Sequence, residues 1–110
     1  MTDKEFRHGL MKIKGVNAVG YRTVKKNTQK PYICCYCVGT DYIYADDIPI
    51  IENTEYNMEL YTEKKDFEIE KLIKTFLSNN EIGYRITTDV RINEINANMV
   101  VFNLTLTEVL

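Results

Sequence analysis

The 110-residue sequence has few of the residues that most enzymes use for catalysis. It contains one histidine, His8, one serine, Ser78, and no tryptophan. It also lacks a phosphate-cradling glycine loop and a metalloprotease motif. A Cys–His nucleophile would need His8 to reach the cysteines at 34–37, which no sequence feature indicates. We therefore predict that the protein is not an enzyme and has no catalytic residue, cofactor or bound metal.

Long apolar runs and large basic clusters are also missing. No stretch approaches the roughly 20 apolar residues of a membrane span, and the N-terminus lacks the basic and apolar segments of a signal peptide. The 14 basic and 16 acidic residues are mixed along the chain, with Lys25-Lys26 and Lys64-Lys65 as the only adjacent basic pairs. These patterns predict a protein of the cytosol that binds neither a membrane nor a specific nucleic-acid sequence.

Two short clusters carry groups that could bind a metal or act in catalysis. Cys34, Cys35 and Cys37 lie in one segment, but a zinc site usually needs a second ligand pair. Small thiols in a strand more often pack in the core. Asp46 and Asp47 could bind a divalent cation or act as acid and base, although adjacent carboxylates in a turn are usually solvated. We interpret both clusters as structural, and a small enzyme that uses either remains an alternative.

Two segments have the pattern of amphipathic helices. The first runs from Thr2 to about Ile13, and Thr2 with Glu5 forms a capping box. The second begins after Asp66, whose carboxylate can cap it, and ends near Asn79. Apolar residues recur at helical spacing in both, at Phe6, Leu10 and Ile13 and at Ile69, Leu72, Ile73, Phe76 and Leu77.

The remaining segments are typical of strands separated by turns. Tyr32–Val38 is apolar on both faces and is predicted to be a central strand, while residues 46, 47 and 49 are expected to end the next one. The predicted extended segments are 18–24, 32–38, 42–45, 55–62, 83–92 and 99–107. This order predicts a single α+β domain over residues 1–110, with a mostly antiparallel sheet and two helices packed on one face.

A loop is expected from Asp41 to Asn53, and it combines apolar side chains with carboxylates. A soluble monomer tends to avoid exposing such groups, and tyrosine is enriched at protein interfaces. We therefore predict an assembly surface with the candidate residues Tyr42, Tyr44, Asp46, Asp47, Ile48, Ile50 and Tyr61. The alternative is that the loop folds back over its own sheet. The basic segment 25–30 and the acidic segment 41–55 could be opposing partners in a subunit contact.

The segment from Asp46 to Asp66 resembles a family of small proteins from the structural-gene cluster of long, non-contractile-tailed bacteriophages and prophages. The most specific part is LYTEKKD at Leu60–Asp66. Tyr21-Arg22 and the run Pro31–Cys34 match an earlier motif, and the resemblance extends over residues 6–106. The cysteine-rich run at 34–37 departs from the aliphatic and aromatic residues that are common there, but it is equally compatible with a strand.

This family resembles tail-terminator or tail-completion proteins. The resemblance implies a homo-oligomeric, hexameric ring that ends the tail tube, joins it to the head connector and has no catalytic residues. The implied partners are copies of the chain itself, the tail-tube protein and the head-connector proteins. The implied location is the host cytoplasm during assembly and then the virion. An alternative is a small cytosolic ligand-binding or regulatory α+β domain, which would need an apolar pocket with converging polar groups.

Overall fold

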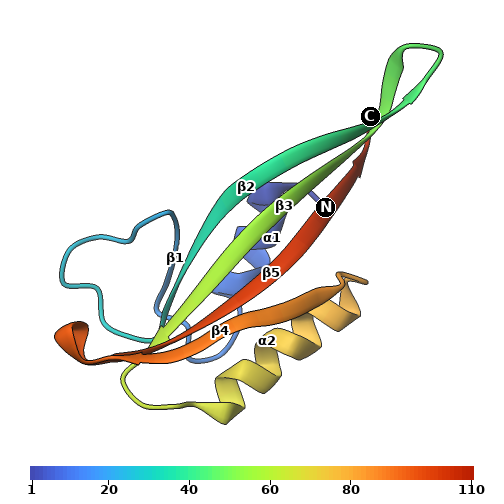
Figure 1. Ribbon diagram of the computed structural model, residues 1–110. Helices are drawn as coiled ribbons and strands as arrows, with labels where there is room; N and C mark the ends of the chain where they lie inside the picture. Colours follow the sequence, from blue (N-terminus) through green and yellow to red (C-terminus); the bar gives the residue numbers. More distant parts are fainter.

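A long antiparallel hairpin forms the middle of the sheet. In the computed structural model, which describes residues 1–110, β2 (Tyr32–Ala45) pairs with β3 (Ile48–Thr62). The other strands are β1 (Ala18–Tyr21), β4 (Tyr84–Ile92) and β5 (Ala97–Val109), and the strand order is β1-β2-β3-β5-β4 (Figure 1). All neighbours are antiparallel except β1 and β2, which run parallel. The prediction of one α+β domain with a mostly antiparallel sheet is confirmed.

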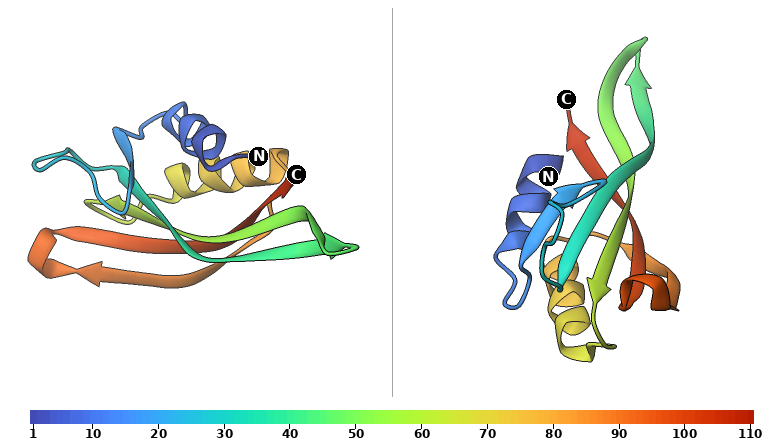
Figure 2. Two further views of the ribbon diagram at one scale, coloured as in Figure 1. Left: turned by 90° about the horizontal axis from the view of Figure 1, so that it is seen from above. Right: turned by 90° about the vertical axis from the view of Figure 1, so that its left-hand side faces the viewer.

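Both helices lie on the same face of the sheet, as predicted (Figure 2). In α1 (Asp3–Met11), the backbone amide of Glu5 donates to Thr2 Oγ1 at 3.1 Å, and Glu5 Oε1 accepts from the Thr2 amide at 3.0 Å. In α2 (Phe67–Asn79), Asp66 Oδ1 accepts from the Ile69 amide at 3.1 Å. Both predicted caps are therefore present. Neither helix has the length and apolar character needed to cross a membrane.

The core lies between the helices and the covered face of the sheet. Alternation in β3 buries Tyr56, Met58 and Leu60, and alternation in β5 buries every second residue from Val100 to Leu106. The helices add Phe6, Leu10, Ile69, Ile73 and Leu77. Gly9 allows α1 to approach α2, because a Cβ there would lie 2.6 Å from the ring of Phe76. Sequence alternation predicts one inward face for each of the segments 55–62 and 99–107, and the buried residues of β3 and β5 confirm both faces.

Alternation over residues 83–92 predicts one face with Tyr84, Ile86, Thr88, Val90 and Ile92, and this prediction is wrong in the C-terminal half of β4. The pairing with β5 shifts between Ile86 and Thr88, so two residues of β4 occupy the space of one. Ile86 pairs with Phe102 on the covered face, whereas Val90 pairs with Met99 on the other face. The extra residue reverses the alternation, and Val90 is exposed.

The cysteine-rich strand β2 is an inner strand, as predicted, only where both β1 and β3 flank it, and β3 occupies the middle of the sheet. The partner β1 covers only residues 32–35 of β2. Cys34 and Cys35 are both buried and face opposite sides of the sheet, as the predicted packing role requires, while Cys37 is half-buried. Burial raises the pKa of the Cys35 thiol to about 12, which keeps it protonated.

Candidate assembly surface

The β2–β3 hairpin extends beyond the helices as a projection, which we call the arm (residues 38–53; Figure 1). β5 flanks the arm at residues 51–53, and beyond them the arm is a two-stranded ribbon. Asp46 and Asp47 form its tip, between the pair Ala45 and Ile48. Their φ angles are 51° and 67°, and two positive φ angles are the requirement of a type I′ hairpin turn. The predicted loop at 41–53 is therefore wrong, except for the extended segment predicted at 42–45, because the segment is strand, turn and strand.

The residues that were expected to break the strand are accommodated for identifiable reasons. Aspartate tolerates the left-handed backbone better than most residues, so Asp46 and Asp47 can replace the usual glycine. Pro49 lies beyond the last β3–β5 pair, Ile51 with Val109, where β3 has a free edge. A proline is tolerated at such an edge because no ladder hydrogen bond is lost there.

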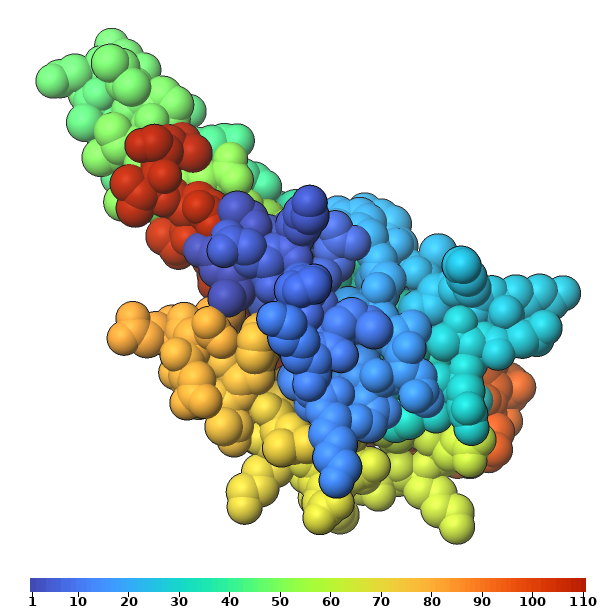
Figure 3. Space-filling view, turned by 180° about the vertical axis from the view of Figure 1, so that it is seen from behind, coloured from blue at the N-terminus to red at the C-terminus, as the bar shows by residue number.

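Apolar side chains are concentrated on the arm and beside it. Of the 15 large exposed hydrophobic residues, eight lie on the arm or at the adjoining C-terminus, and Ile48 is 64% and Tyr44 60% exposed. The eight are Val38, Tyr42, Ile43, Tyr44, Ile48, Ile50, Val109 and Leu110. The arm points away from the rest of the molecule and does not fold back over its sheet (Figure 3). Each of these residues is at least 39% exposed.

The arm is also uniformly acidic. Residues 39–63 hold seven acidic side chains and no lysine or arginine, whereas residues 1–38 hold eight basic and two acidic ones. The formal charges of these segments are −7 and +6. The basic and acidic residues are therefore separated between these two segments, and are not mixed along the chain as predicted. A count of charged residues in windows of about 25 residues reveals this separation.

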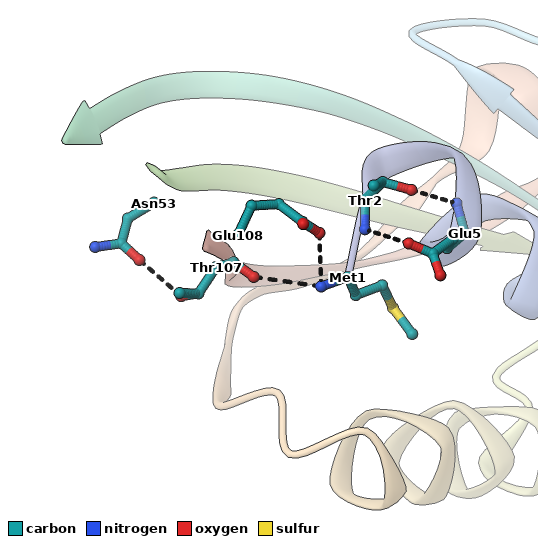
Figure 4. A network of polar contacts seen from close by, with 6 residues as sticks. All are labelled: Met1, Thr2, Glu5, Asn53, Thr107 and Glu108. Carbon is teal, nitrogen blue, oxygen red and sulfur yellow. Dashed lines mark hydrogen bonds and ion pairs between the residues drawn. The ribbon is translucent and has the colours of Figure 1, made fainter. Parts of the chain in front are cut away.

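The base of the arm is fixed by both ends of the chain (Figure 4). The Thr107 hydroxyl donates to Asn53 Oδ1 at 2.7 Å, and the Leu110 amide donates to the carbonyl of Ile50 at 2.9 Å. The amino group of Met1 lies 2.7 Å from Glu108 Oε1 and 3.3 Å from the carbonyl oxygen of Thr107. These contacts hold the root of the arm against the sheet.

Tyr61 is the one candidate interface residue that lies far from the others. The structure places the remaining six, from Tyr42 to Ile50, together on the arm, whereas Tyr61 is near the opposite end of β3. Its ring stacks on Tyr32 with centroids 5.1 Å apart, and its hydroxyl donates to Glu59 Oε1 at 2.8 Å. Burial, together with the hydrogen bond to Glu59, raises the pKa of Tyr61. Tyr61 therefore belongs to a different surface.

That surface is the face of the sheet opposite the helices, and it carries a connected polar network. Glu59 also accepts from the Tyr36 hydroxyl at 3.2 Å. Farther along, the Asn103 amide donates to Glu55 at 2.8 Å and to Asn57 at 3.0 Å. The polar positions of β3 alternate with its buried ones, so the sequence predicts which residues of β3 form this face. It does not predict the hydrogen bonds among their side chains.

The groups considered for catalysis do not come together. The cysteines lie toward the start of β2, and Asp46 and Asp47 follow its end. His8 is exposed on α1. No group of three or more metal-ligating side chains converges. A hollow of about 620 Å³ lies between the helices, lined by residues that include His8, Ile13, Leu72 and Phe76.

A comparison of the chain with protein-family models gives no match, and neither does a search of curated proteins. The candidate surface therefore rests on its own geometry. That geometry is a projecting ribbon with uncovered apolar side chains, a single sign of charge and a fixed base.

Proposed function

We propose that this chain is a structural subunit of a phage virion, which forms an oligomeric ring at the end of the tail tube. The ring terminates the tail and joins it to the head connector. The observation that carries the proposal is the arm, because its apolar side chains and strand edges are uncovered in the isolated chain. Assembly subunits need such surfaces, and a monomeric protein of this size gains nothing from them.

The strand edges of the arm support an assembly role. Beyond Cys35, β2 has no strand partner on the β1 side. On the β5 side of β3, residues 48 and 49 have no partner, and Ile50 accepts only from the Leu110 amide. Free edges expose N–H and C=O groups that can pair with another chain, and proteins usually protect them with lysine or a bulge. The arm has no lysine. Register shifts between Cys37 and Gly39 and between Ile43 and Tyr44, together with Pro49, interrupt parts of its edges, and the rest of the β2 edge is free. Such an edge is suited to a partner that covers it in the assembled state.

The residues of the resemblance have structural roles in the fold. Leu60 and Thr62 are buried, Asp66 caps α2, and Lys65 Nζ lies 2.8 Å from Glu70 Oε2 and 2.6 Å from Asp89 Oδ2. Lys65 thus connects the start of α2 with β4. This role supports the proposal, because a motif that maintains the fold is what related assembly subunits would share even if their contact surfaces differ.

The alternative, a small ligand-binding or regulatory domain, would place its ligand in the hollow between α1 and α2. The distribution of exposed apolar residues favours assembly. Of the 15 such residues, only Leu72 lines that hollow, whereas eight lie on or beside the arm. The apolar surface of the molecule is thus mainly on a projection, where a partner protein can reach it.

The proposal is tested with the double variant Tyr44→Ser/Ile48→Ser. Both side chains are exposed, so we expect the variant to fold like the wild type, with the same circular dichroism and melting temperature. We expect it to fail to complete tails in a complementation assay that counts infectious particles and images tails by electron microscopy. The matched control is Met11→Ser/Val90→Ser, which removes two exposed apolar side chains away from the arm. Normal tail completion by the folded arm variant would contradict the role of the arm, and normal tail completion in the absence of the chain would contradict the function.

A further inference from the structure

A second charged segment lies at the far end of the molecule from the arm. We call it the basic loop (residues 22–30), and it connects β1 to β2. It holds Arg22, Lys25, Lys26 and Lys30 and no acidic residue, whereas the arm holds Asp41, Asp46, Asp47 and Glu52 and no basic one. The two segments carry equal and opposite formal charge, four against four.

The strand β2 fixes the distance between them. It begins directly after the basic loop and ends at the tip of the arm, and its 14 residues span about 45 Å at about 3.3 Å per residue. The long axis of the molecule is 51 Å, and the two segments lie at its opposite ends (Figures 1 and 3). The acidic arm therefore cannot reach the basic loop of its own chain.

The basic loop is held at both ends. The Asn17 side chain donates to the carbonyls of Gln29 and Lys30 at 3.1 and 3.0 Å, and the Asn17 amide donates to the carbonyl of Pro31 at 2.8 Å. At the other end, Arg22 lies over the rings of Tyr21 and Tyr36, 5.7 and 5.6 Å from their centroids. A docking partner would thus meet a formed surface.

A hollow of about 330 Å³ lies under this loop. Its basic residues are Arg22, Lys25 and Lys26, and its apolar and aromatic lining includes Tyr32, Tyr61 and Ile95. The tip of the arm has the complementary composition, with two carboxylates at Asp46 and Asp47 beside the exposed Tyr44 and Ile48. Both charge and apolar character therefore match between the tip and the hollow.

We propose that the arm of one chain docks on the basic loop of a second copy, with its tip in the hollow beneath that loop. This inference names the partner of the arm, and it rests on the proposed role of the arm in assembly. The contact joins two different surfaces, so it is heterologous and leaves one arm and one loop free on each pair of chains. Further copies add in the same way until a ring closes. Pairing of two arms is disfavoured, because each carries four like charges.

The first test uses the unmodified protein. A mixture of ¹⁵N-labelled and unlabelled chains is treated with a carbodiimide, which joins carboxylates to lysines in direct contact, and the products are mapped by mass spectrometry. We expect cross-links from Asp46 or Asp47 to Lys25 or Lys26, with mixed labelling because they join different chains. We also expect association that weakens with added salt, as measured by analytical ultracentrifugation. A wild-type protein that stays monomeric and gives no such cross-link would overturn the inference.

The second test removes one side of the contact at a time. The arm variant is Asp41→Lys/Asp46→Asn/Asp47→Asn, in which asparagine preserves the positive φ at the turn. The loop variant is Lys25→Glu/Lys26→Glu. Each is expected to be monomeric alone, and their mixture is expected to form one-to-one pairs and nothing larger, because only one intact arm and one intact loop remain. Self-association of either variant like the wild type, or a mixture that forms no pairs, would contradict the inference.

The control Lys64→Glu/Lys71→Glu changes the net charge by the same amount at exposed lysines outside the loop, and it should associate like the wild type. Equal loss of association in this control would mean that net charge alone drives the contact and would overturn the inference.

Tail completion separates this inference from the proposed function. If tails are completed in the absence of this chain while the wild type still associates through the contact, the function is wrong and the contact stands. If the wild type is monomeric and the arm variant fails in tails, the contact is wrong and the function stands.

Discussion

Ile51 and Val109 form the last residue pair between β3 and β5, and beyond this pair the arm continues without β5. Two further contacts, of Asn53 with Thr107 and of Ile50 with Leu110, lie within two residues of this pair. The hairpin therefore has a braced base and an unsupported tip. Its tip geometry depends mainly on the turn at Asp46 and Asp47.

Substitutions at Asp47 should alter the stability of the tip. Asp47→Gly gives the Asp-Gly pair that type I′ turns prefer, whereas Asp47→Ala places a Cβ at a φ of 67°. We expect the alanine variant to open more easily than the glycine variant by about 1 kcal/mol, or roughly fivefold. Amide hydrogen exchange across residues 44–50 measures this difference. Equal exchange in both variants would show that the turn does not have this conformation.

The N-terminal cap of α2 should contribute measurably to stability. Asp66→Ala removes the acceptor of the Ile69 amide and should lower the free energy of unfolding by about 1 kcal/mol. Asp66→Asn is the control, because asparagine is an equally good cap. Urea denaturation checks both variants. An alanine variant as stable as the wild type would mean that the hydrogen bond is not formed in solution.

Lys65 of the LYTEKKD motif should contribute more to stability than its neighbour Lys64. Glu70 is 5% exposed and contacts Lys65, so Lys65→Met leaves a buried carboxylate without its partner. We expect the free energy of unfolding to fall by about 2 kcal/mol. This is less than the usual cost of breaking a buried ion pair, because Lys65 is partly exposed. Lys64→Met should change it by less than about 0.5 kcal/mol, since Lys64 is exposed. Chemical denaturation of the two variants distinguishes these outcomes.

The three cysteines should react with thiol reagents at different rates in the native protein. Cys37 is half-buried and should react first, whereas burial raises the pKa of Cys35 to about 12 and should make it the slowest. A Cys37→Ala variant should lose the fast phase, and all thiols should react rapidly in denaturant. Mass spectrometry of partially labelled protein identifies the order. Early labelling of Cys35 would be inconsistent with its position in the core.

Stability should fall at alkaline pH. Burial raises the pKa of Cys35 and of Tyr56 to about 12 each, so in the folded state both keep their protons to higher pH than in the unfolded chain. Between about pH 9 and 12 the unfolded state binds fewer protons, and the free energy of unfolding must therefore decrease as pH rises. The contribution of these two groups to the free energy of unfolding is fully present below about pH 9. Tyr56→Phe should make the decrease shallower above about pH 10, as measured by urea denaturation across pH.

Much of the fold could be predicted because its signals are local. The caps at Thr2 and Asp66 depend on side chains three residues apart, and the faces of β3 and β5 follow from strict alternation. The bulge in β4 could not be predicted, since it depends on pairing with β5 and leaves no mark in the sequence. The arm was mistaken for a loop because Asp-Asp lacks the glycine of most two-residue turns. Tyr61 was grouped with the arm because alternation identifies a face but not a position in space.

The strand order has a consequence for the time course of synthesis. β3 can pair with β2 as soon as both have left the ribosome, but its other edge is filled by β5, whose paired residues are 36 to 58 positions later in the chain. Until then, β3 has one bare edge in the middle of the future sheet. Contacts between distant parts of a chain form slowly. A nascent chain is therefore most exposed to mispairing with its neighbours just before its last residues are made.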